Sequence, residues 1–207
     1  MLHNIQSHDF NLSDDPLDIY VAISTLEIEH QPTAHSDIHS TNQSTIVGWL
    51  KNVSQVNSDT QIAKQLFYRP ASVKAKDLIK AWLYHLTAHA SGHKLDTLII
   101  GLDEQYQFTH LSIDAANELL QSWFTLYAKS LTQPVAFFPQ SALEYAKTQD
   151  IGKAKLKFSG GQYIGRGESE DPYIRLNFKN LDDVQQEFIQ LSDDLLMPLI
   201  QQLEEIN

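Results

Sequence analysis

The chain has no cysteine among its 207 residues. This excludes disulfide bonds and thiolate metal sites, and it is typical of proteins that stay in a reducing cytoplasm. Long apolar runs are also missing. The longest, Leu98–Leu102, is far shorter than the roughly 20 residues of a membrane-spanning helix, and Met1–Pro16 lacks the apolar core of a signal peptide. We therefore expect a cytoplasmic protein that does not enter a membrane.

Basic residues are few, since 15 Lys and Arg stand against 26 Asp and Glu and the formal net charge is −11. The surface as a whole is thus unsuited to a phosphate backbone, which binds clustered cations. The cations are uneven, however, and none follows Lys179. We call one group the basic strip: Lys64, Arg69, Lys74, Lys76 and Lys80, with Asp77 as the one acid between them. One basic face on an acidic body suits local contact with DNA or an acidic partner.

Length and composition favour one folded unit. At 207 residues and 42% hydrophobic content, the chain can bury a sizeable core. The polar segment Met1–Pro16 is expected to be a frayed linker, and residues 17–207 are expected to form a single domain.

Two strand patterns open this domain. Leu17–Glu29 alternates apolar and polar residues and shifts register near Ser24-Thr25, which indicates a bulge or turn. Thr45–Val53 is the second, with Val47 and Trp49 on the same side. We expect the two strands to pair as a long antiparallel ribbon.

A helix and two further strands follow. The segment from Ala75 has apolar residues at helical spacing: Leu78, Ile79, Trp82, Leu83 and Leu86. Pro70 keeps the residue before it extended, so Ser72 is expected to cap this helix and Gly92 to end it. Leu95–Leu102 predicts a strand buried on both faces, and a turn at Asp103-Glu104 leads to a strand at Tyr106–Leu111.

The second half is mainly helical by its patterns. Ser112 can cap a helix that ends near Ser130, with these core positions: Ala116, Leu119, Leu120, Trp123 and Tyr127. An S-x-x-E capping box starts a shorter helix at Ser141, and Lys153–Phe158 suggests another strand. Asn180 is expected to cap the last helix, which Pro198 should break or kink.

Three ordered motifs resemble a known family. They are Phe67–Gly92 (FYRPASVKAKDLIKAWLYHLTAHASG), Pro134–Pro139 followed by Ser141, and Gly167-Glu168 with Asp171-Pro172-Tyr173. Their order and distances are similar to the C-terminal region of the RecC family, the gamma subunit of exodeoxyribonuclease V. The resemblance covers Leu17 to the C-terminus. Family members are several times longer, so it implies that the chain is a C-terminal fragment without the larger N-terminal region.

The fold class follows from both lines of argument. The element order predicts an α/β or α+β domain with a mixed central sheet flanked by helices and an N-terminal β-ribbon. Its order of helix, buried strand, strand and helix resembles the core of restriction-endonuclease-like, PD-(D/E)XK-like nucleases, which is also the fold that the family implies.

Catalytic residues of such nucleases are not found in the sequence. They hold a divalent metal with an acid on one strand and a D/E-x-K triplet on the next. No lysine in this chain has Asp or Glu two residues before it, and Asp103, the possible first acid, faces a strand with neither a carboxylate nor a lysine. We therefore interpret Asp103-Glu104 as turn residues and expect no catalytic and no metal-binding residues.

Two other patterns in the sequence are typical of binding sites. Gly160–Gly167 (GGQYIGRG) nearly matches a phosphate-binding loop, but Arg166 and Gly167 replace its lysine and hydroxyl, so a surface loop is the preferred interpretation. His85, His89 and His93 recur every four residues, which suits either zinc on one helix face or histidines that meet the negative end of the helix. The second alternative is preferred.

The function implied by the resemblance is that of a non-catalytic domain in a helicase–nuclease complex for recombinational repair of double-strand breaks. ATP and Mg²⁺ would belong to the beta and alpha subunits, and the fragment itself would need no cofactor. It would scaffold these partners and contact forked DNA. The candidate DNA- or partner-binding residues are Arg69, Lys74, Lys76, Lys80 and Arg166. The alternatives are an active nuclease with a rearranged metal site and a pure protein-interaction module. The Gly160–Asp171 loop and the ribbon tip are both possible strand-splitting projections.

Overall fold

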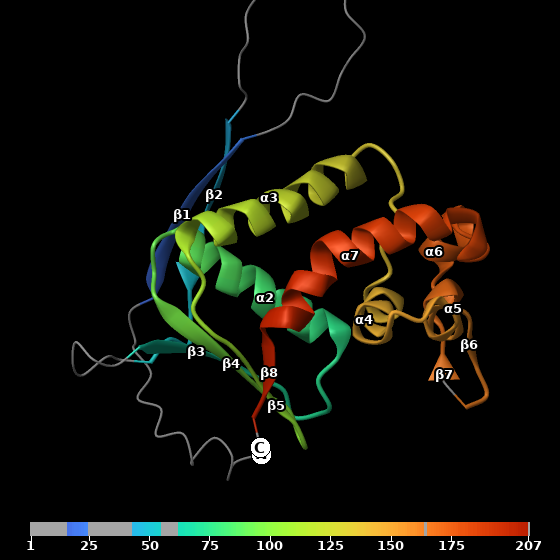
Figure 1. Cartoon of the computed structure of the whole chain (residues 1–207), viewed down its shortest axis with the longest axis horizontal. Helices are drawn as coiled ribbons and strands as arrows, with labels where there is room; N and C mark the ends of the chain where they lie inside the picture. The colour runs from blue at the N-terminus through green and yellow to red at the C-terminus, as the bar shows by residue number, and fades with distance from the viewer. Residues whose placement is uncertain (1–15, 25–42, 55–61, 164, 207) are drawn as a thin grey trace, which may run out of the picture.

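The computed structural model describes residues 16–24, 43–54, 62–163 and 165–206, and it has one half that contains most of the strands together with two long helices and another half that is mainly helical (Figure 1). The strands are β1 Leu17–Ser24, β2 Gln43–Leu50, β3 Ala63–Tyr68, β4 Leu95–Ile100, β5 Gln105–Phe108, β6 Gly160–Gly161, β7 Gly165–Arg166 and β8 Leu203–Glu205. The helices are α2 Ala75–Ala90, α3 Ile113–Ser130, α4 Pro139–Thr148, α5 Ile151–Ser159, α6 Pro172–Asn177 and α7 Gln185–Gln202, with 3₁₀ turns η1 Glu168–Glu170 and η2 Asp182–Val184.

The N-terminal ribbon is confirmed. β1 and β2 pair antiparallel along their whole length, and Ile19 lies opposite Gly48. The alternation in β1 buries Ile19, Val21 and Ile23 toward the helices. The expected register shift after Ser24 falls outside the described residues, and so does most of the ribbon tip.

A mixed four-stranded sheet forms the centre of the first half. Its order is β3-β4-β5-β8, with β3 and β4 parallel and the other pairs antiparallel. α2 provides the crossover between the two parallel strands, as a parallel pair requires. The expected strand buried on both faces is β4, in which every residue except Asp96 is buried. The mixed sheet with flanking helices confirms the α+β class.

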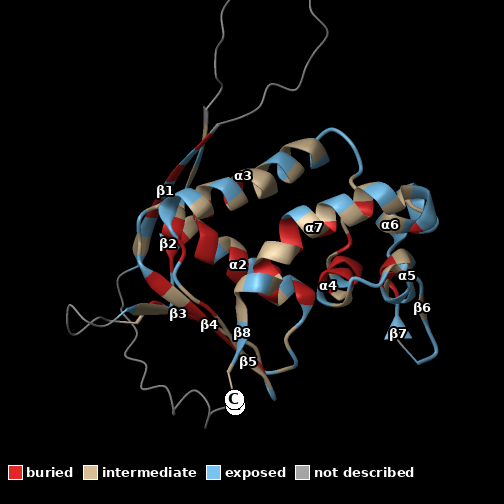
Figure 2. Cartoon of the chain, in the orientation of Figure 1, coloured by how far each residue is buried: buried red, intermediate tan, exposed pale blue. Residues whose placement is uncertain are grey.

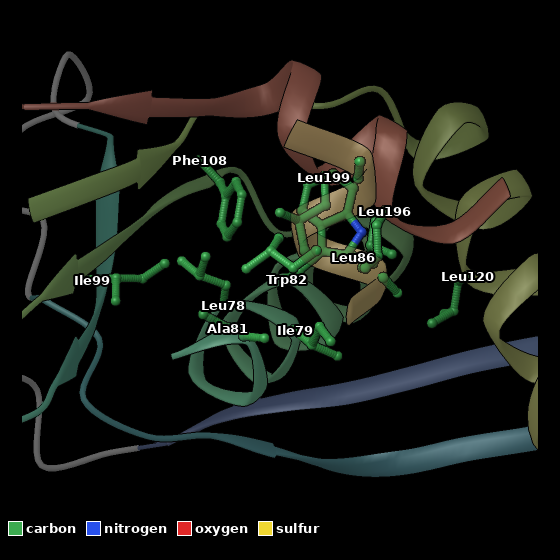
Figure 3. Packing of buried hydrophobic residues seen from close by; sticks show 14 of the residues in the cluster. Leu78, Ile79, Ala81, Trp82, Leu86, Ile99, Phe108, Leu120, Leu196 and Leu199 are labelled. Atoms are coloured by element: carbon green, nitrogen blue, oxygen red, sulfur yellow. The ribbon is translucent and has the colours of Figure 1, made fainter. Parts of the chain in front are cut away.

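The core centres on Trp82 of α2, which is fully buried (Figure 3). Its ring centroid lies 4.9 Å from that of Phe108 in β5. Leu196 and Leu199 of α7 are in the same cluster, so α7 packs against the same core as α2 (Figure 3). Figure 2 shows the buried residues running from the ribbon through α2 into α4 and α7.

The expected strand at Lys153–Phe158 is wrong, because these residues belong to helix α5. The Asp150 side chain accepts hydrogen bonds from the Gly152 and Lys153 N–H groups and caps the helix. Ala154 and Phe158, four residues apart, are buried, whereas Leu156 is 52% exposed. The apolar period is therefore helical.

A break or a kink was expected at Pro198, and of these two the break does not occur. Helix α7 continues through Pro198 to Gln202. Leu195, Leu196 and Leu199 around the proline are buried, and we attribute the intact helix to this packing. The chain then enters strand β8, in which Leu203 pairs with Phe108 of β5.

Helix starts were predicted with mixed success. Ser112 caps α3 by accepting from the Ala115 N–H, and Asn180 accepts from the Asp183 N–H at η2, just before α7. Ser72 does not cap α2, whose N-cap is Lys74. Tyr127, expected in the core of α3, is 57% exposed. None of the helices in the described ranges combines the length and apolarity needed to cross a membrane.

Candidate functional site

The first of the three motifs that resemble the family, Phe67–Gly92, contains the junction between β3 and α2. Arg69 leaves the sheet with its N–H donating to the Ile100 carbonyl, and its Nη1 lies 2.7 and 3.0 Å from the two carboxylate oxygens of Asp77. The same carboxylate accepts the Lys74 N–H at the start of the helix. Arg69 was a candidate DNA- or partner-binding residue, but the structure uses its guanidinium to fix this junction, so its charge is largely neutralised.

The turn between β4 and β5 holds the junction from the other side. Glu104 accepts the Val73 N–H at 2.6 Å and the Tyr106 hydroxyl at 2.8 Å. Burial, and then this hydrogen bond, raise the pKa of Tyr106 to about 12. Asp103 is exposed in the same turn. Both acids therefore behave as turn residues, and Glu104 positions the chain that enters α2.

The remaining cations of α2 are exposed. Lys74, Lys76 and Lys80 lie outside the buried face of the helix, as the apolar spacing predicted. Within the described residues, none of the three has a carboxylate within 4.0 Å. Lys74 and Lys76 stand at the start of α2, where the helix dipole disfavours positive charge, and Lys80 lies one turn further on. Three lysines there strengthen the local positive potential without adding to the stability of the helix.

Arg166 is not brought to these lysines. It lies in the β6–β7 hairpin, which Figure 1 shows in the helical half, apart from the start of α2. Its Nε is 3.7 Å from a Glu170 carboxylate oxygen, and both side chains are exposed. The hairpin follows helix α5, so it lacks the preceding strand of a phosphate-binding loop. Tyr163, at the end of the loop, is 95% exposed.

A buried carboxylate organises the motif Gly167-Glu168. Glu168 accepts the Gln140 N–H at 2.9 Å, the Ser141 N–H at 2.8 Å and the Ser141 hydroxyl at 2.6 Å. It thereby satisfies free donors in the first turn of α4. The expected S-x-x-E box at Ser141 is wrong, because α4 begins at Pro139 and the cap is remote in sequence. Gly167, which precedes Glu168 in this motif, lets the chain pass close to the end of α5, since a Cβ there would lie 2.4 Å from the Gly160 nitrogen.

The three histidines of the four-residue repeat have separate structural partners. His85 Nε2 lies 3.0 Å from the Thr109 carbonyl and Nδ1 lies 3.0 Å from the Thr97 hydroxyl. Because a carbonyl only accepts, Nε2 carries the proton and Nδ1 accepts from the threonine. His89 Nε2 donates to the Leu95 carbonyl, and His93, which follows the helix, contacts the Asp18 carbonyl at 2.6 Å.

The pKa values of the two buried rings, His85 and His89, are lowered by their surroundings. Burial, and then the neighbouring His89, lower the pKa of His85 to about 3. Burial also lowers the pKa of His89. Across the residues that the structure describes, no cluster of three or more His, Cys, Asp or Glu side chains has the arrangement of a metal site.

One set of surface residues was missed by the sequence arguments. Trp49 of β2, Tyr68 of β3 and Tyr84 of α2 are 58%, 61% and 37% exposed, and they line the same groove. The sequence carries partial signals for them. Trp49 shares its side of β2 with Val47, and Tyr84 falls outside the apolar stripe of α2. Neither signal shows that strand and helix bring them together.

Comparison with known families gives one match. Residues 15–150 match the model of the RecC C-terminal domain, which is more than half of the chain. The match ends before the motifs Gly167-Glu168 and Asp171-Pro172-Tyr173, so these two lie beyond it. A comparison with curated proteins finds no match. On the strength of the matched residues, which include the ribbon, the β3–α2 junction and α4, the chain belongs to the RecC C-terminal domain family.

Proposed function

We propose that the chain is a non-catalytic domain of the gamma subunit of exodeoxyribonuclease V, which scaffolds the beta and alpha subunits and contacts DNA at the fork. The family match over residues 15–150 is the observation that carries this proposal. In this account ATP hydrolysis and Mg²⁺-dependent cleavage belong to the other subunits. The domain acts in the cytoplasm of a bacterium during recombinational repair of double-strand breaks.

The proposal includes a single nuclease-like domain over residues 17–207. One cluster of buried hydrophobic residues extends from Ile19 in the ribbon to Leu199 in α7, which supports a single unit. The mixed sheet, with α2 connecting the parallel strands β3 and β4, supports a core of the restriction-endonuclease-like type. A scaffold of this type can keep its shape for binding after its catalytic groups are lost.

A scaffolding role also has a surface to support it. An apolar groove of about 510 Å³ lies between α3 and the segment that leads to α4, and Trp123, Phe124 and Phe137 line it. Tyr127 and Leu131 nearby are 57% and 67% exposed. Exposed apolar patches of this kind are typical of protein–protein interfaces. The same apolar groove also favours the alternative function, a protein-interaction module that does not contact DNA.

The unpaired lysines of α2 support contact with DNA, and salt dependence tests it. We expect the chain to bind forked DNA at low salt, with an affinity that falls steeply as salt rises. Each phosphate contact contributes about −0.9 to the slope of the logarithm of the binding constant against the logarithm of the salt concentration. The double variant Lys74→Glu/Lys76→Glu should weaken binding on the order of tenfold and flatten the slope by roughly 1.8, which is two such contacts. Fluorescence anisotropy across a salt series measures both quantities.

A matched pair of exposed lysines provides the control. Lys153 and Lys179 lie outside α2 and also have no carboxylate within 4.0 Å among the described residues. Lys153→Glu/Lys179→Glu changes the net charge equally, so it should leave fork binding within about twofold if contact is local. Equal effects from both pairs would mean that only net charge matters. Unchanged binding in the α2 variant would remove the basic strip from the account.

A further inference from the structure

A groove opens where the strands β2 and β3 separate. The chain after β2 bridges β3 between Val53 and Gln65, and the Leu66 N–H donates to the Asn52 carbonyl at 2.9 Å. Asn52 has a φ of 59°, a left-handed conformation that turns the chain at this point. Beyond the bridge, no ladder joins β2 to β3 in the described ranges. The space between them has a volume of about 610 Å³, and α2 contributes to its wall.

Three aromatic side chains are exposed on this groove. Trp49 comes from β2, Tyr68 from β3 and Tyr84 from α2, so three separate elements present rings to one space. The Tyr84 ring packs edge-on against Phe67, with centroids 5.6 Å apart, which limits its freedom. We name this site the aromatic groove and define it by Trp49, Lys51, Gln65, Tyr68, Lys80 and Tyr84.

The charge of the aromatic groove is opposite to that of the chain. Lys51 and Lys80 are exposed on its wall, and no Asp or Glu lines it among the described residues. The whole chain has a net charge of −11, so acids are the commoner charged residues elsewhere. A groove whose charged lining residues in the described ranges are both lysines, and which also has three exposed aromatic rings, therefore favours an anionic ligand that offers flat apolar faces.

A buried amide adds hydrogen-bonding capacity. Gln65 is 1% exposed and lines the groove, and its Nε2 donates to the Lys51 carbonyl at 3.3 Å. Its Oε1 has no hydrogen-bond partner among the described residues. Unsatisfied buried acceptors are uncommon, and a ligand donor or a water molecule normally completes them.

We propose that the aromatic groove binds single-stranded nucleic acid. Bases stack on Trp49, Tyr68 and Tyr84, and Lys51 and Lys80 bind the adjoining phosphates. A single strand fits better than a duplex, because its bases expose the π faces that aromatic side chains need. The inference rests on the proposed function only for the expectation that this domain meets DNA, and it adds which form of DNA is bound and where.

Binding of a fluorescent 12-nucleotide oligo(dT) by the full chain tests the proposal. Stacking on an aromatic side chain contributes enough that Trp49→Ala or Tyr68→Ala should weaken binding roughly 5- to 100-fold. Trp49→Phe keeps a ring and should retain binding within about threefold while losing the tryptophan quenching that oligo(dT) causes in the wild type. Lys51→Gln/Lys80→Gln should flatten the salt slope by about 1.4, which is two single-strand contacts of 0.7 each.

Two controls separate stacking from charge. An abasic 12-mer has the phosphates without the bases, so it should bind at least about tenfold more weakly than oligo(dT). Tyr173→Ala removes a tyrosine that is 81% exposed on α6 and should change nothing. Thermal melting establishes that each variant is folded. Equal binding of the abasic strand, or full binding by folded Trp49→Ala, would overturn the proposal.

The binding of oligo(dT) and the assembly with other subunits are measured separately. Co-purification with the beta and alpha subunits measures the scaffolding role, and Trp49→Ala should leave it unchanged. A chain that assembles but does not bind oligo(dT) would refute the aromatic groove and leave the proposed function standing. A chain that binds oligo(dT) through this groove but joins neither subunit would refute the scaffold and leave the groove.

Discussion

Acidification from pH 7.5 to pH 4 is expected to lower the free energy of unfolding by about 3 kcal/mol through His85 alone, since each unit of pKa difference is worth about 1.36 kcal/mol. The pKa of this imidazole is about 3 in the folded chain and 6.5 when unfolded. Above pH 6.5 the ring is neutral in both states and its contribution to stability is complete. Below that value the unfolded chain binds a proton that the folded chain does not bind, and stability falls until pH 3.

The physical reason lies in the packing of His85, on α2, against β4 and the residue that follows β5. Both ring nitrogens are already committed to Thr97 and Thr109, and the ring stacks on Trp82 with centroids 5.7 Å apart. A second ring proton on Nδ1 would force the Thr97 hydroxyl to change from donor to acceptor and would place a charge beside His89, whose ring centroid is 4.4 Å away. His89 titrates in the same direction, because burial lowers its pKa as well.

The variant His85→Gln isolates this effect. Glutamine can donate to the Thr109 carbonyl and accept from Thr97 without titrating. Urea unfolding at pH 7.5, 6, 5 and 4 should therefore show the variant losing about 3 kcal/mol less than the wild type over this range. Parallel curves for the two proteins would mean that His85 does not titrate as its surroundings require.

Removal of the Glu168 carboxylate is the second change with a large expected effect. Glu168→Ala should lower the free energy of unfolding by roughly 3 kcal/mol, because it leaves two backbone donors and a hydroxyl without an acceptor. These donors sit in the first turn of α4, where negative charge is favoured. Differential scanning calorimetry at pH 7.5 should show a lowered Tm.

Two further variants test whether the effect of Glu168→Ala comes from the hydrogen bonds that its carboxylate accepts. Ser141→Ala removes one of the three donors and should cost about 1 kcal/mol. Glu118→Ala removes an exposed glutamate on α3 and should stay within about 0.5 kcal/mol. If Glu168→Ala were no more destabilising than Glu118→Ala, the buried carboxylate would not be the cap that holds α4.

Elements with a clear apolar period were predictable from the sequence. The ribbon, helix α2, strand β4 and helix α3 follow patterns that a single sequence carries. Lys153–Phe158 misled because Ala154, Leu156 and Phe158 also alternate, and only packing shows that Leu156 faces solvent.

Features that depend on distant residues were not predictable. Glu168 reaches the start of α4 from 27 residues away in sequence, and Glu104 reaches Val73 from 31 residues away. Likewise the sequence did not show that the guanidinium of Arg69 forms an ion pair with Asp77. The aromatic groove combines two strands and a helix, so the exposure of Trp49 has meaning only once they are placed together.

Co-purification with the partner subunits tests the central claim most directly. A tagged form of the folded chain, mixed with the beta and alpha subunits of exodeoxyribonuclease V from the same organism, should retain at least one of them in stoichiometric amount at physiological salt. The chain alone, without the other subunits, should show no nuclease activity on linear DNA with Mg²⁺. Retention of neither subunit by the folded chain, or cleavage of linear DNA by the chain alone with Mg²⁺ that Asp103→Ala abolishes, would contradict the account.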